Sequence, residues 1–247
     1  QDSLAEKCVT GDGKFQPEDS PVCKAFPEIL AGGSFLDHVA ERAETWENFH
    51  VLVVRLDPVK GREDEFSEDD AMVTVAEVVA EAFEKISGLW GILCGDCLGC
   101  AVEILDAAEV LNLAENMRDK VEQKCGKTVS IGIAGYPLLS YEKKDILDNA
   151  RKALDHALCF GPGSVVEFDA VSLNISGDKL YQRGDVDGAV KEFETALLLD
   201  PENVNVRNSL GVCHGVKGNH QKAIEEFQMA MKFDPGVSDD RGIVGAQ

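Results

Sequence analysis

No stretch of the 247-residue sequence is apolar over the roughly 18 residues that a membrane-spanning helix requires, so we expect no transmembrane segment. Positive charge is also scarce: 24 Lys and Arg residues stand against 45 Asp and Glu residues, and the formal net charge is −21. A surface of this sign repels the phosphates of nucleic acids and the headgroups of anionic lipids. We therefore expect no nucleic acid and no membrane among the partners, and an anionic nucleotide would need a local basic pocket.

Cysteine is too rare for a disulfide scaffold, because only 8 of the 247 residues are cysteines and such scaffolds contain more than about 8–10%. These cysteines are scattered through segments with the pattern of core elements, which favours reduced thiols and a cytoplasmic location. The one pair that could plausibly form a disulfide is Cys8 and Cys23, which flank a polar loop.

Hydrophobic periodicity predicts alternating helices and strands after a loop-rich lead-in over residues 1–23. A predicted strand hairpin interrupts the alternation, which favours a mixed sheet with helices packed on it, an α+β arrangement of ferredoxin-like type. Helices are predicted at 34–46 (with Ser34 as N-cap), 71–86, 107–124 and 144–160, and strands at 49–56, 89–93, 101–105, 128–134 and 164–168.

The centre of the predicted hairpin is the run Cys94-Gly95-Asp96-Cys97-Leu98, in which Gly and Asp favour a tight turn. With Cys100 it also forms a C-x2-C-x2-C pattern, which can wrap a metal or an iron–sulfur cluster. Such a cluster needs a fourth cysteine nearby followed by proline, but the next cysteine is Cys125 and no proline follows it. We therefore favour three small residues packed around a turn, with no metal and no cofactor.

The last third of the chain repeats itself with a period of 34 residues. Six positions recur: Gly177, Gly184, Ala189, Phe193, Ala196 and Pro201 are matched by Gly211, Gly218, Ala223, Phe227, Ala230 and Pro235. This period and its small-residue positions resemble the tetratricopeptide (TPR) family, in which paired helices stack into an array. The resemblance implies an all-α array over 170–247, with repeats at 170–203 and 204–237 and a third beginning near Gly245, and a protein partner on the concave face.

The predicted strand Val129-Ser130-Ile131-Gly132-Ile133-Ala134 follows the hairpin at a distance that resembles the GGDEF (diguanylate cyclase) family. The helix that contains Ala150-Arg151-Lys152-Ala153-Leu154 resembles the closing helix of the same family. This resemblance covers roughly residues 24–169 and implies a nucleotide-cyclase-like mixed sheet, in which Cys94-Gly95-Asp96-Cys97-Leu98 stands at the signature turn.

The resemblance also implies where catalytic groups would stand, and most are replaced. The first metal-binding carboxylate falls on Arg55, and the acidic ligand of the signature falls on Cys97. An arginine repels a cation by about 4 kcal/mol per unit charge at roughly 4 Å and an effective dielectric constant near 20. Asp57 and Lys60 persist as possible ligand contacts. The guanine contacts fall on Glu63 and Met72, the phosphate-binding lysine on Leu158, and the inhibitory R-x-x-D site on Lys85 and Gly88.

The sequence thus predicts a non-catalytic signalling or assembly scaffold, with a degenerate GGDEF-like domain coupled to a protein-binding array. Two alternatives remain open. One is a module that senses a nucleotide or cyclic-di-GMP, for which Arg55 and Lys60 are the candidate cations. The other is metal binding through Cys94, Cys97 and Cys100.

Overall fold

The computed structural model describes residues 20–58, 67–103 and 106–234 and divides the chain into two compact units, Gln1–Phe168 and Asp169–Gln247. Several sequence positions discussed above lie outside the described residues: Cys8, Lys60, Glu63, Pro235 and Gly245. None of the described helices combines the length and the apolar content that crossing a bilayer requires.

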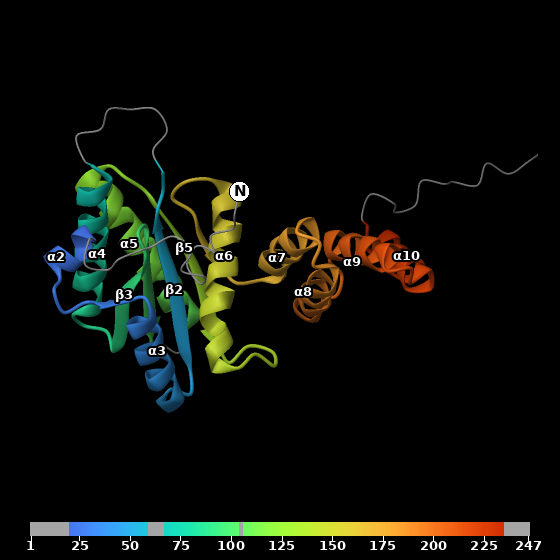
Figure 1. Cartoon of the computed structure of the whole chain (residues 1–247), viewed down its shortest axis with the longest axis horizontal. Coiled ribbons are helices and arrows are strands. Elements are labelled where there is room, and N and C mark those ends of the chain that lie inside the picture. The colour runs from blue at the N-terminus through green and yellow to red at the C-terminus, as the bar shows by residue number, and fades with distance from the viewer. Residues whose placement is uncertain (1–19, 59–66, 104–105, 235–247) are drawn as a thin grey trace, which may run out of the picture. The chain divides into compact units, whose positions relative to one another are not determined.

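The first unit is built around a six-stranded mixed sheet with the strand order β1-β3-β4-β2-β5-β6 (Figure 1). β3, β4, β2 and β5 pair antiparallel, and β1 and β6 add parallel edges. The sheet and its helices confirm the predicted α+β fold class. The strands are β1 (Leu30–Ala31), β2 (Phe49–Leu56), β3 (Gly88–Cys94), β4 (Cys97–Val102), β5 (Val129–Tyr136) and β6 (Val165–Glu167).

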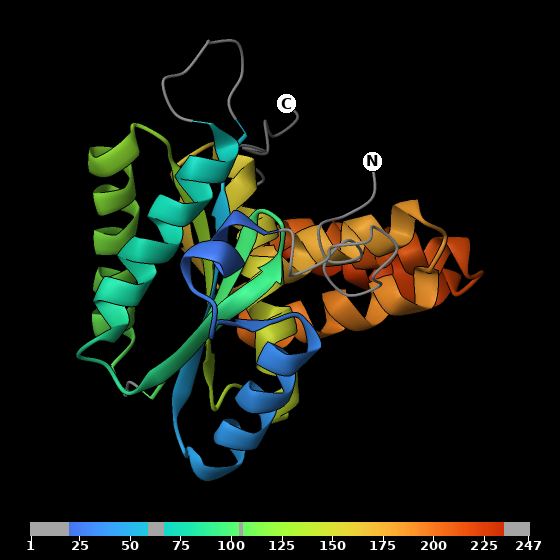
Figure 2. The same ribbon diagram turned by 60° about the vertical axis from the view of Figure 1, so that its left-hand side comes forward.

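Helices cover both faces of this sheet (Figure 2), and each face has its own hydrophobic core. One core contains side chains of α2, α4 and α5, and the other contains side chains of α3 and α6. β2 contributes alternate residues to both cores, which explains its nearly continuous apolar sequence. The helices are α2 (Pro21–Ala25), α3 (Gly33–Thr45), α4 (Glu68–Phe83), α5 (Ala107–Cys125) and α6 (Ile146–Phe160), with the 3₁₀ turn η2 (Lys143–Asp145) before α6.

The starts of α3 and α4 differ from the sequence prediction, and α6 begins two residues after the predicted 144 because η2 precedes it. The predicted N-cap Ser34 lies inside α3, whose N-cap is Gly32. α4 begins three residues before the predicted 71, because Ser67 caps it by accepting a hydrogen bond from the Asp70 backbone N–H, 3.1 Å away. The acidic residues of its first turn suit the positive end of the helix dipole.

The second unit consists of two helical hairpins, α7 (Ala170–Gln182) with α8 (Val186–Leu199) and α9 (Val204–Val216) with α10 (His220–Phe233). Gly177 and Gly211 allow the helices of each hairpin to approach closely. A Cβ atom at Gly177 would lie 2.5 Å from the Phe193 ring, and one at Gly211 would lie 2.7 Å from the Phe227 ring. The repeated alanines Ala189, Ala196, Ala223 and Ala230 are all buried.

Candidate functional site

The β3–β4 hairpin places two thiols side by side. Cys94 and Cys97 are register partners on either side of the two-residue turn Gly95-Asp96. On its other side, β4 pairs with β2, and Cys97 stands opposite Arg55. Residues that face each other across neighbouring strands project to the same face of a sheet. Cys94, Cys97 and Arg55 therefore form one row of side chains across three strands.

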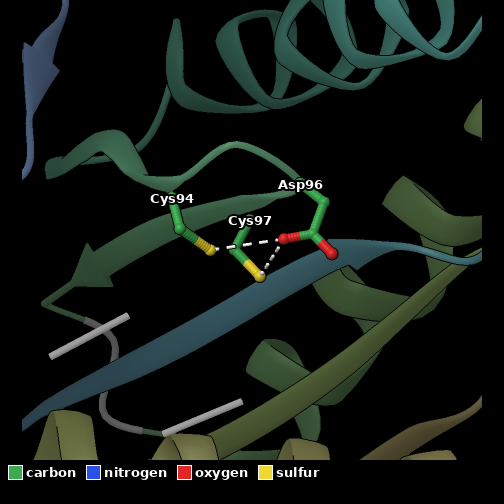
Figure 3. Close-up of side chains that lie close together, drawn as sticks. All are labelled: Cys94, Asp96 and Cys97. Carbon is green, nitrogen blue, oxygen red and sulfur yellow. Dashed lines mark hydrogen bonds between the residues drawn. The ribbon is translucent and has the colours of Figure 1, made fainter. Parts of the chain in front are cut away.

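Asp96 connects this row (Figure 3). Its Oδ1 atom accepts hydrogen bonds from the Cys94 Sγ at 3.3 Å and from the Cys97 Sγ at 3.5 Å. Its Oδ2 atom accepts a hydrogen bond from the Arg55 Nε at 2.9 Å, which is also an ion pair. The backbone carbonyl of Asp96 accepts from the Leu56 N–H at 3.0 Å, so the turn is attached to the end of β2.

The ion pair shifts the titration of both partners. Burial by itself would raise the pKa of Asp96, but the hydrogen bond and charge of Arg55, together with the two thiol donors, outweigh it and hold that pKa below its usual range. For Arg55, burial by itself would lower the pKa, and the hydrogen bond and charge of Asp96 outweigh it and raise the pKa above its ordinary value. Both groups are therefore charged at neutral pH.

Asp57, the second carboxylate near this turn, is buried, and both of its oxygens accept hydrogen bonds from neighbouring segments. Its Oδ1 atom accepts from the Ser130 Oγ at 2.7 Å, and its Oδ2 atom accepts from the Thr128 Oγ1 and the Gly163 N–H, both at 2.8 Å. These bonds join the end of β2 to the start of β5 and to the loop before β6. Asp57 thus stabilises the junction of three segments.

A cavity of about 370 Å³ opens beside the ion pair. It brings together Arg55, Asp57, Met72 and Asp96, four of the positions at which the sequence resemblance places catalytic or signature groups. Glu68 and Asp69 of α4 also line it, and no sequence motif singled them out. The remaining lining residues are Leu56, Pro58 and Gly95.

Cys100 and Leu98 lie away from this group. Both side chains belong to the core under α4 and α5, whereas Cys97 belongs to the core under α3 and α6. A spacing of three along a strand reverses the face, so Cys100 cannot join the pair. The structure therefore separates the C-x2-C-x2-C pattern and adds Asp96 to the two remaining cysteines. Burial raises the pKa of the Cys100 thiol, as expected for a side chain in an apolar core.

The comparisons with known proteins agree with this division of the chain. Residues 176–238 match the family model described as tetratricopeptide repeat. The GGDEF domain of TpbB, also called YfiN, from Pseudomonas aeruginosa is 20% identical and has a TM-score of 0.51, and the match covers 62% of this chain and 95% of that one. The first unit therefore has the fold of a GGDEF domain. No curated protein matches the sequence.

Two further solved structures are similar at lower scores. The GGDEF domain of DgcB from Caulobacter crescentus, solved in complex with c-di-GMP, is 19% identical, with a TM-score of 0.48 over 56% of this chain and 87% of that one. The diguanylate cyclase SiaD of Pseudomonas aeruginosa, solved with its activator SiaC, is 17% identical, with a TM-score of 0.49 over 56% of this chain and 58% of that one.

Proposed function

We propose that the first unit is a GGDEF-like domain without cyclase activity, and that the chain serves as a signalling or assembly module whose repeats bind a protein. The observation that carries this proposal is the ion pair between Arg55 and Asp96 at the signature turn. By resemblance, the position of Arg55 would hold a metal-binding carboxylate. A guanidinium there binds the carboxylate that remains and opposes a catalytic cation with a fixed positive charge.

Asp57 and Asp96 are poorly placed to form a magnesium site of the kind that phosphoryl transfer needs. Mg²⁺ takes oxygen ligands in near-octahedral geometry and is usually held by one or two carboxylates and substrate phosphates. The two carboxylate oxygens of Asp57 together accept hydrogen bonds from three donors, and one oxygen of Asp96 accepts a hydrogen bond from Arg55. Recruiting Asp57 would break its bonds to the partly exposed Thr128 and Gly163 and would leave the buried Ser130 hydroxyl without this partner, which costs about 1–3 kcal/mol.

We expect no cyclic dinucleotide when the full chain is incubated with GTP and either Mg²⁺ or Mn²⁺. Product formation would be followed by chromatography and mass spectrometry against a blank without protein. The matched variant is Asp96→Asn, which keeps the size of the side chain and removes its charge. Product that forms with the unmodified chain and disappears with Asp96→Asn would contradict the proposal, because it would assign turnover to this turn.

A nucleotide-sensing role receives no support from the charge of the cavity. Four carboxylates line it, from Asp57, Glu68, Asp69 and Asp96. Among the lining residues that the structure describes, Arg55 is the only cation, and Asp96 already binds it. Phosphate groups need unpaired donors or cations, so this cavity is a poor site for an anionic nucleotide.

Tetratricopeptide arrays present extended surfaces to protein partners. In this chain α9 exposes two apolar side chains, Val212 (44% exposed) and Val216 (60% exposed), on a strongly acidic protein. A partner segment that combines apolar and basic residues would fit this surface.

We expect proteins captured by the full chain to be lost with the double variant Val212→Asp/Val216→Asp and to be retained with Phe160→Asp. Phe160 is the matched control, because it is 70% exposed and lies in the first unit. Captured proteins would be compared by quantitative mass spectrometry. If no captured protein depends on Val212 and Val216, the assignment of partner binding to this surface is wrong.

A further inference from the structure

Three metal-ligating atoms converge at the β3–β4 turn. The Sγ atoms of Cys94 and Cys97 and a carboxylate oxygen of Asp96 all lie within 4.8 Å of one another (Figure 3). We propose that these three side chains form a binding site for a soft divalent metal ion, with Zn²⁺ as the best match. This site lies at the signature turn, but its two thiolate ligands differ from the oxygen ligands of a magnesium-dependent centre, and it does not depend on the proposed function.

The distances fit tetrahedral coordination by two sulfurs and one oxygen. With Zn–S near 2.3 Å and Zn–O near 2.0–2.2 Å, a tetrahedron places sulfur and oxygen about 3.5–3.7 Å apart and the two sulfurs about 3.8 Å apart. The corresponding distances from Asp96 Oδ1 are 3.3 Å to the Cys94 Sγ and 3.5 Å to the Cys97 Sγ. Only small side-chain rotations would be needed to accept the ion.

The fold holds the ligands in place. The two cysteines flank a two-residue turn in register, which gives the C-x2-C spacing found in structural zinc sites. Cys97 is fully buried, and the backbone bond from Leu56 to Asp96 holds the turn against β2. Cys94 and Asp96 are partly exposed, so an ion can reach the site from solvent. Three protein ligands leave a fourth position for water.

The charges at this site suit a metal ion bound by two thiolates and one carboxylate. They suit a hard cation less well, because such a cation would be bound by carboxylates alone. In the metal-free state both thiols direct their protons at Asp96 Oδ1. On binding, each thiol releases its proton to solvent and the metal ion takes the place of the two protons. Two thiolates and one carboxylate then carry three negative charges against the two of Zn²⁺. Arg55, which binds the other oxygen of Asp96, neutralises the remaining charge.

The donor set selects among metals. Thiolates favour Zn²⁺ and other soft ions, whereas Mg²⁺ and Ca²⁺ prefer oxygen ligands alone. An iron–sulfur cluster needs four cysteines as a rule, and the structure turns Cys100 to the opposite face of the sheet. The geometry therefore points to a mononuclear site.

The test uses the reduced full chain with Co²⁺ as a spectroscopic probe and Zn²⁺ as a competitor. We expect one Co²⁺ per chain, with near-ultraviolet absorption from thiolate ligands, and complete displacement by Zn²⁺. Cys94→Ser and Cys97→Ser should each lower the affinity by at least about 100-fold, since loss of an outer-sphere partner alone costs about 10–100-fold. Asp96→Asn should weaken binding and retain the thiolate absorption.

Two controls separate this site from adventitious binding. Cys159→Ser removes the exposed thiol of α6, and Asp69→Asn removes an exposed carboxylate near the cavity; both variants should bind Co²⁺ as the unmodified chain does. Zn²⁺ should also protect Cys94 and Cys97 from alkylation in a peptide map. The proposal fails if no thiolate absorption develops, if binding survives in Cys94→Ser/Cys97→Ser, or if the two cysteines in the protein as isolated form a disulfide and, once reduced, do not bind Co²⁺.

Discussion

Replacing Gly132 by alanine should destabilise the first unit by about 3 kcal/mol or more. Gly132 lies in the middle of β5, where the strand faces α6. A Cβ atom there would lie 2.1 Å from the Leu154 backbone nitrogen and 2.2 Å from the Ala150 carbonyl oxygen. Both neighbours are backbone atoms of a helix, so no side-chain rotation can relieve the contact. Accommodation would require α6 to move away from the sheet.

The measurement is chemical denaturation followed by tryptophan fluorescence. The chain has two tryptophans, Trp46 and Trp90, and both belong to the first unit, so the signal reports on that unit alone. Gly33→Ala is the matched control, because it makes the same substitution at the start of α3, where an added Cβ meets nothing within 4 Å. Alanine there should leave the stability unchanged or raise it slightly, since glycine is a poor helix residue. Equal stabilities of the two variants would show that α6 does not pack on β5 as closely as described.

The predictable part of the fold depends on periodicity. β2 was predicted with its observed bounds, Phe49–Leu56, because both of its faces are buried and its apolar run is continuous. The hairpin was predicted because two apolar runs flank glycine and aspartate, but its second strand begins at Cys97 and not at the predicted 101, because the turn takes only Gly95 and Asp96. α2 and β1 were missed, since five and two residues are too few to establish a period. The start of α4 was missed because capping by Ser67 and the helix dipole outweighed the loop-like composition of the acidic residues.

The candidate site was predictable as a list of positions and unpredictable as a set of contacts. Resemblance to a family placed Arg55, Met72 and Cys97 at positions where that family carries catalytic or guanine-binding groups. The link from Arg55 to Asp96 spans 41 residues of sequence and depends on the order of β2 and β4 in the sheet, which no local pattern reveals. The separation of Cys100 could have been foreseen, because two residues three apart on one strand face opposite sides.

Phe193 and Phe227 occupy the same position in successive repeats and should differ strongly in their contribution to stability. Each ring packs over a glycine of its own hairpin, Gly177 or Gly211. Phe193 is only 1% exposed, because α8 also packs against α9 of the next hairpin. Phe227 is 37% exposed, and no helix follows α10 within the described residues. Val190 and Ile224, which also occupy one position in successive repeats, show the same difference in burial: Val190 is 8% exposed and Ile224 is 50% exposed.

We therefore expect Phe193→Ala to destabilise the second unit by about 3–5 kcal/mol and Phe227→Ala by about 1–2 kcal/mol, since less apolar area is lost. The second unit has no tryptophan, so the measurement is hydrogen exchange with mass spectrometry on peptides from residues 170–234. With tenfold for every 1.4 kcal/mol, Phe193→Ala should speed the slowest amides of α7–α9 at least about 100-fold, and Phe227→Ala about tenfold. Peptides of the first unit provide the internal reference. Equal acceleration by the two variants would contradict the structure, because it would mean that Phe227 in solution is covered as completely as Phe193.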